Sequence, residues 1–168
     1  MNWRKRSRAV STPSGTLAWA GYAACAWCCV FAAMSFYWAT GGIAGLATLS
    51  PSIQKLALEP DPTFTAILWI TGILKLVGGL LALALVRSWD WLIPRRMLLA
   101  VAWIGCAVMV VHGSDFLVRG MLWMSGIVNV PESVSATVIY GYALVWGPWW
   151  LLGGILFGAT AWYYQRGL

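Results

Sequence analysis

The chain has 168 residues, of which 61% are hydrophobic and only 10% are charged. Soluble domains are about 45–50% apolar and about 25% charged, so this composition excludes an ordinary soluble domain. The formal net charge is +6, but the basic residues lie beside apolar runs, where they set orientation in a membrane, so we expect no nucleic-acid binding.

Four apolar runs divide the sequence, and each is close to the roughly 20 residues that a helix needs to cross a hydrocarbon core. They predict transmembrane helices at about 17–38, 64–86, 97–118 and 134–164. The expected fold class is therefore an all-α integral membrane bundle of four transmembrane helices, forming one domain over residues 17–166. Residues 1–16 are basic and then rich in Ser, Thr, Pro and Gly, and we expect them to form a flexible cytoplasmic tail.

The first apolar run follows a basic segment, as the core of a secretory signal peptide does. The run is longer than the roughly 7–15 residues of a signal core, and no clean cleavage site ends it, so we expect a retained helix. After it, Ser50 and Pro51 predict the start of a short interfacial helix in outer loop one, which Pro60 and Pro62 would end.

Two further features concern the second half of the chain. The segment 120–130 is apolar but short and contains two glycines, so we expect it to lie in the outer interface or to fold back as a cover. Pro148 lies inside the fourth run, where it removes a backbone hydrogen bond and is expected to kink the helix.

The distribution of Lys and Arg predicts the orientation of the bundle. One side carries the basic residues of the tail, the second loop and the C-terminus: Arg4, Lys5, Arg6, Arg8, Arg87, Arg95, Arg96 and Arg166. The first and third loops hold Lys55 and Arg119 beside three acidic residues: Glu59, Asp61 and Glu132. The positive-inside rule therefore places both termini in the cytoplasm.

Lys75 stands in the middle of the second apolar run. A charge at the centre of a membrane span is costly and is tolerated mainly inside a bundle or a wet cavity. Steps of three and four residues put Lys75 on one helix face with Gly72, Gly78 and Gly79, and small residues let a neighbouring helix approach closely. We therefore expect Lys75 to point into the bundle.

The third helix offers partners for Lys75. His112, Asp115 and Arg119 are spaced i, i+3 and i+7, so they share a face of that helix. Side chains lean towards the N-terminus of their own helix, so Lys75 leans outward while His112 and Asp115 lean inward. We take these four residues as the candidate polar site.

Two interpretations of this site remain open. It is either a functional polar column, which relays protons, conducts ions or binds a small anionic ligand, or a structural ion pair between Lys75 and Asp115 that fixes the helices. A neutral buried Lys75 is a further alternative.

The four cysteines all lie within predicted helices, so they do not form a secreted disulfide framework: Cys25, Cys28, Cys29 and Cys106. Cys25 and Cys28 form a C-x-x-C pair that could exchange disulfides, but thiols at the apolar midplane should be inert, and we interpret them as packing residues. His112 with nearby methionines could suggest copper. Methionine is also a common apolar filler, and we expect no metal and no cofactor.

The fourth helix contains small residues that could pack against another helix: Gly153, Gly154 and Gly158. The Gly154-x-x-x-Gly158 motif either packs within the bundle or makes a dimer.

Two motifs resemble those of a known family. Phe36-Tyr37-Trp38-Ala39-Thr40-Gly41-Gly42 resembles the aromatic-Trp-x-x-Gly-Gly signature of a bacterial family of small four-helix membrane proteins, and Trp149-Trp150-Leu151-Leu152-Gly153-Gly154 resembles its last helix. The resemblance covers nearly the whole chain. It implies the same fold and topology and the bacterial inner (plasma) membrane, but no catalytic residues, because the family is a domain of unknown function.

Three functional interpretations follow, and the leading one is a non-enzymatic accessory or partner-binding protein of the inner membrane. Its partners would be the lipid bilayer and either a second copy of the chain or another membrane protein. The alternative is a small transporter of ions, protons or a solute through a column of Lys75, His112 and Asp115. The third is a membrane thiol redox protein that uses Cys25 and Cys28.

Overall fold

The computed structural model describes residues 15–59, 61–87 and 94–166, and these residues form helices and loops without a strand. In chain order the elements are α1 (Gly15–Ala39), η1 (Leu46–Thr48), α2 (Pro51–Leu58), α3 (Pro62–Val86), α4 (Arg95–Met124), α5 (Ala136–Tyr140), η2 (Gly141–Trp146) and α6 (Gly147–Arg166). The predicted tail lies outside the described residues except for residues 15 and 16, which begin α1.

Four helical segments are long and apolar enough to cross a membrane: Ala18–Ala39, Pro62–Val86, Arg95–Met124 and Ala136–Arg166. In the last segment, α5, η2 and α6 continue one another without a break. Helices dominate because lipid offers the backbone no hydrogen-bond partners, so each crossing segment must satisfy its own amide groups. The prediction of an all-α fold with four long apolar helices is confirmed.

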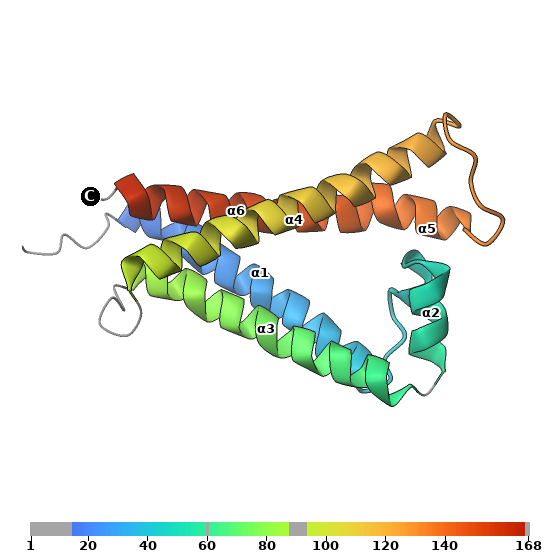
Figure 1. The fold of residues 1–168 in the computed structure, drawn as a ribbon, viewed down its shortest axis with the longest axis horizontal. Helices are drawn as coiled ribbons and strands as arrows, with labels where there is room; N and C mark the ends of the chain where they lie inside the picture. Colours follow the sequence, from blue (N-terminus) through green and yellow to red (C-terminus); the bar gives the residue numbers. More distant parts are fainter. Residues whose placement is uncertain (1–14, 60, 88–93, 167–168) are drawn as a thin grey trace, which may run out of the picture.

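The long helices form two antiparallel pairs, which diverge from a common end (Figure 1). α1 lies along α3, α4 lies along α6, and α1 also packs against α6. By contrast, α3 and α4 make few contacts, and Figure 1 shows them moving apart with distance from the end where α3 stops and α4 begins. The start of α1 and the end of α6 also lie at this common end.

At the divergent end, η1 and α2 connect the two helix pairs. The indole N–H of Trp146 in η2 donates a 2.9 Å hydrogen bond to the hydroxyl of Thr48 in η1. Gly141 lies directly against the Thr48 backbone, where a Cβ atom would come within 2.6 Å of the Thr48 carbonyl oxygen. α2 in turn contacts α3, so this short segment holds one pair to the other.

The short helix predicted after Ser50 is present as α2. Pro51 occupies its first turn, and the Ser50 hydroxyl accepts a 3.4 Å hydrogen bond from the amide of Ile53. This side-chain cap satisfies one of the amide groups that a helix start leaves unpaired.

The fourth crossing segment widens into a π-helical turn, η2, immediately before Pro148. The amide of Gly147 donates to the carbonyl of Tyr142, five residues back instead of four. Proline has no amide hydrogen and its ring collides with a preceding carbonyl in a regular helix, so the helix departs from regular geometry at this point. The predicted disturbance at Pro148 therefore takes the form of this wider turn.

The third crossing helix is longer than the sequence predicted. α4 continues to Met124, so the first part of segment 120–130 is helix and not a separate cover or interfacial segment. Gly120 explains the extension, because it lets α4 approach η2 so closely that a Cβ atom would come within 2.7 Å of the Ala143 amide nitrogen. Ser125 caps the end of the helix, just before Gly126, whose φ of 72° favours glycine.

Aromatic side chains fill the contact between α1 and α6. Trp27 stacks on Trp149 with 5.6 Å between ring centroids, and its indole N–H donates a 3.1 Å hydrogen bond to the Trp149 carbonyl. Phe31 packs edge-on against Trp150 with a centroid separation of 4.9 Å. These contacts join the two helix pairs next to Lys75, which lies over the Phe31 ring.

Candidate functional site

Lys75 lies near the middle of α3 and is held by α1. Its Nζ atom donates a 2.6 Å hydrogen bond to the Ser35 hydroxyl and lies 4.1 Å from the centroid of the Phe31 ring. The Ser35 hydroxyl donates in turn to the Phe31 carbonyl at 3.3 Å. The ammonium group is thus positioned by one hydroxyl and one aromatic face.

Lys75 has no carboxylate partner among the described residues, where the ion pairs are Lys55–Glu59 and Arg119–Asp115. An ammonium group has three N–H donors. With one donor used by Ser35, Lys75 keeps hydrogen-bonding capacity for another group, and its charge is not neutralised by an acidic residue in this part of the chain.

The small-residue face of α3 packs against α1. Gly72 lies against the Phe36 ring, and a Cβ atom at Gly79 would come within 3.1 Å of the Cys28 Cβ atom. This packing is why the predicted ion pair between Lys75 and Asp115 does not form. Small residues permit close approach without selecting the neighbour, and here the neighbour is α1 and not α4.

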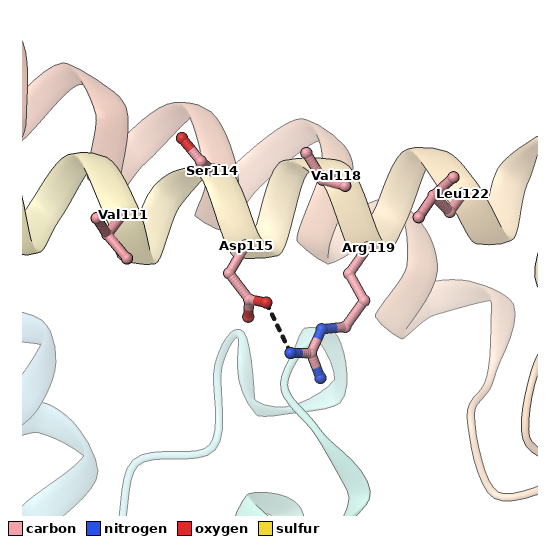
Figure 2. A pocket seen from close by; sticks show the side chains of 6 residues that line it. All are labelled: Val111, Ser114, Asp115, Val118, Arg119 and Leu122. Carbon is pink, nitrogen blue, oxygen red and sulfur yellow. Dashed lines mark hydrogen bonds and ion pairs between the residues drawn. The ribbon is translucent and has the colours of Figure 1, made fainter.

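Asp115 and Arg119 instead pair with each other on α4 (Figure 2). The Arg119 guanidinium donates a 2.7 Å hydrogen bond to the Asp115 carboxylate, and both side chains are more than half exposed. They border an open pocket of about 460 Å³, which is lined by Val111, Ser114, Asp115, Val118, Arg119 and Leu122. In Figure 2 both side chains point away from the ribbon of α4 towards the side on which the chain between α1 and α2 lies.

His112 lies among aromatic rings. Its ring packs edge-on against Phe116, with 4.9 Å between centroids, and against Trp150, with 4.7 Å. Because Trp150 also packs on Phe31, and Lys75 lies over Phe31, a chain of ring contacts connects His112 with Lys75. The four predicted site residues thus lie in three separate groups, and no hydrogen bond links one group to another. The groups are Lys75, His112, and Asp115 with Arg119.

Sequence reasoning missed three residues of this site. Ser35 is a buried hydroxyl near the end of the first predicted helix, whereas Lys75 is central in the second, so spacing from the helix ends did not place the two at one level. Phe31 and Trp150 could not be distinguished from the many other aromatic residues, because ring contacts between helices depend on the helix arrangement.

The cysteines of the described residues are all free. Cys28 is buried against Gly79, Cys25 is half-buried on the same side of α1, and Cys29 is exposed. Within the ranges that the structure describes, no group of three or more His, Cys, Asp and Glu side chains could hold a metal ion.

The glycines of α6 contact its neighbours inside the bundle. Gly153 lies against the ring of Trp27 on α1, where a Cβ atom would come within 2.5 Å. Gly154 lies against Val110 and Gly158 against the Cys106 thiol, both on α4. The Gly154-x-x-x-Gly158 motif is therefore occupied by a contact within the chain.

The comparisons with known proteins identify a family but no activity. No curated protein and no solved structure matches the chain. A protein family described as "Protein of unknown function (DUF3995)" matches residues 28–157, from the middle of α1 to the middle of α6. Since this match covers most of the chain and includes at least part of each of the four long apolar helices, the chain belongs to the DUF3995 family, whose function is unknown.

Proposed function

We propose that this chain is a non-enzymatic accessory protein of the membrane, which binds a partner inside the bilayer at Lys75. The observation that carries the proposal is the cation at the centre of α3, with a hydroxyl and a ring as its contacts and no acidic partner among the described residues. An unpaired charge in apolar surroundings costs free energy. A partner that brings a hydrogen-bond acceptor or an anion would remove that cost.

We further propose that the protein resides in a bacterial inner membrane with both termini in the cytoplasm. Arg87, Arg95 and Arg166 support this orientation, because they stand at the ends of α3, α4 and α6 that lie at the common end of the bundle. The positive-inside rule assigns that end to the cytoplasm.

Transport through a polar column has less support. Lys75 is bonded to Ser35, and Asp115 is bonded to Arg119, so the groups that would have to pass an ion onward are engaged in separate contacts. Thiol redox chemistry also has less support, because Cys28 is packed against Gly79 at the contact of α1 with α3.

Native mass spectrometry of protein extracted in a mild detergent tests the binding proposal. The full chain and the control Lys55→Met, which changes an exposed Lys on α2, should both carry an additional bound mass that Lys75→Met lacks. The additional mass can be a lipid, a second copy or another polypeptide. Equal masses on all three proteins would overturn the proposal. If Lys75→Met fails to fold, Lys75→Gln, which keeps a polar side chain but removes the charge, should also lack the additional mass.

A flux measurement separates binding from transport. The protein is reconstituted into liposomes that contain a pH-sensitive dye, and a proton or potassium gradient is imposed. Binding alone predicts the leak rate of empty liposomes. A rate that rises with protein content and falls in Lys75→Met would favour transport instead.

A further inference from the structure

We infer that the partner is a transmembrane helix of another protein that carries an Asp or Glu near its centre, and that it docks along α3 at Lys75. This inference rests on the proposed function and names the chemistry of the partner. Three observations carry it: the depth of Lys75, the pattern of burial along α3, and the positions of the acidic residues in this chain.

The depth of Lys75 favours a protein carboxylate over a lipid headgroup. Lys75 lies at the middle of the 25-residue helix α3, so at 1.5 Å per residue it is roughly 16–20 Å from either end. The headgroups of both leaflets lie outside the hydrocarbon core. A carboxylate at mid-depth is therefore most simply carried there by a helix that spans the membrane, since charged groups within spans pair with one another.

A half-buried stripe along α3 has the spacing of a helix-packing seam. Its members recur at steps of four, three, four and three residues as far as Gly78, with a further step of three to Leu81: Phe64, Leu68, Thr71, Lys75, Gly78 and Leu81. This is the repeat of helices that pack side by side with a left-handed crossing. Lys75 follows Thr71 in this stripe, and this small neighbour on the side of the divergent end leaves room for a second helix to approach the ammonium group.

The stripe faces the side on which the two helix pairs diverge. A Cβ atom at Gly78 would come within 3.8 Å of Phe157 on α6, and Lys75 lies over Phe31, which packs on Trp150 of α6. From Lys75 towards the divergent end, α3 and α4 move apart (Figure 1), so this part of the stripe has no neighbouring long helix other than α1.

A second copy of the chain would not supply the carboxylate at this depth. The sequence holds five acidic residues: Glu59, Asp61, Asp90, Asp115 and Glu132. Of the four that lie in the described residues, only Asp115 lies within a crossing segment, and it is already paired with Arg119. Measured along the helices from the common end, Asp115 is roughly 30 Å away on α4 and Lys75 is roughly 16 Å away on α3. The two groups therefore lie at different depths.

The test uses synthetic transmembrane peptides of Leu and Ala with one central residue, either Asp or Leu. Each labelled peptide is reconstituted with the labelled protein in phospholipid nanodiscs. Energy transfer between the labels measures association. We expect the peptide with central Asp to bind the protein and the Lys55→Met control at least about tenfold more tightly than the peptide with central Leu. Lys75→Met should abolish this difference.

Two further arms keep the result interpretable. A peptide whose Asp is moved by seven residues, or roughly 10 Å, should bind no better than the Leu peptide, because its carboxylate misses Lys75. Lys75→Asp, paired with a peptide that carries a central Lys, should recover the preference. Recovery also shows that the variant protein is folded.

Equal binding of the Asp and Leu peptides would overturn the inference. If the peptides bind equally but the extracted protein still carries a lipid that Lys75→Met lacks, the proposed function stands and the inferred partner is wrong. If neither Lys75-dependent mass nor peptide preference is found, both proposals fail.

Discussion

The ammonium group of Lys75 on α3 donates a 2.6 Å hydrogen bond to the hydroxyl of Ser35 on α1, 40 positions earlier in the chain. The same ammonium lies 4.1 Å from the Phe31 ring centroid. Lys75 therefore joins the two helices of the first pair by a polar contact that an apolar residue could not replace. The contact also keeps the charge beside the ring cluster that joins α1 to α6.

Ser35→Ala should weaken the contact between α1 and α3. The buried hydroxyl accepts from a charged donor, so its loss should lower the free energy of unfolding by about 1–2 kcal/mol. Reversible unfolding in mixed detergent micelles measures this, with Ser52→Ala on the exposed surface of α2 as the control. In a Lys75→Met background the cost of Ser35→Ala should shrink; an undiminished cost would show that the two side chains are not coupled.

Gly113→Ala should destabilise the second helix pair. The added Cβ atom would come within 2.8 Å of the Leu151 amide nitrogen on α6, and backbone cannot move aside as a flexible side chain can. We expect the free energy of unfolding to fall by roughly 1–3 kcal/mol. The matched control is Gly78→Ala, whose Cβ atom would come no closer than 3.7 Å to its nearest neighbour, the Cys28 sulfur. If both variants melt at the same temperature, the close approach of α4 to α6 is wrong.

Thr48→Val should loosen the connection at the divergent end. It removes the acceptor of the Trp146 indole hydrogen bond while keeping the size of the side chain. We expect the free energy of local unfolding to fall by about 1 kcal/mol in the segment around Thr48, while the long helices keep their stability. Hydrogen exchange should therefore accelerate in residues 44–59. Thr40→Val is the control, because the Thr40 hydroxyl donates only to the adjacent last turn of α1, to the Phe36 and Tyr37 carbonyls.

The ion pair of Asp115 with Arg119 should contribute little to stability. Both side chains are more than half exposed and stand four residues apart on one helix. A double-mutant cycle of Asp115→Asn and Arg119→Gln should give a coupling energy below about 1 kcal/mol. A coupling several times larger would place the pair in hydrocarbon, where neither group has water to replace its partner.

The thiols should differ in their reaction with a membrane-permeant maleimide. In single-cysteine variants, Cys29 should react fastest, because it is exposed, and Cys28 more than about tenfold more slowly, because only 3% of its surface is exposed. Time courses followed by mass spectrometry give the rates. Rapid labelling of Cys28 in the folded protein would revive the redox interpretation.

The number and approximate span of the long helices were predictable, because a hydrocarbon environment leaves a crossing segment few structures other than a helix. The helix that packs against Lys75 was not predictable. The glycines beside it indicated a close contact, but α1 and α4 both carry small residues, and only the packed arrangement shows that Gly72 and Gly79 meet α1. Opposite charges at suitable spacing suggested Lys75 with Asp115, yet Arg119, four residues from Asp115 on the same helix, takes that carboxylate.

The end of α4 illustrates a second limit. The two glycines in segment 120–130 suggested a break, but they have opposite roles. Gly120 lies inside the helix and permits its approach to Ala143, whereas Gly126, with a positive φ, follows the helix end. A glycine that breaks a helix and one that packs it against a neighbour have the same side chain, so contact with η2 decides between them.

The π-helical turn of η2 has a consequence for how this chain can change in length. Gly141, at its start, faces Thr48, and Gly147, just after it, faces Leu117 on α4. A π-helical turn holds about one residue more than an ordinary helical turn, so deleting one residue between 141 and 146 would give a regular helix without turning α5 against α6. Gly141 would then keep its contact with η1. A single-residue deletion inside this turn should therefore be tolerated, whereas a deletion in the regular part of α6 would turn all that precedes it by about 100° and separate Gly141 from Thr48.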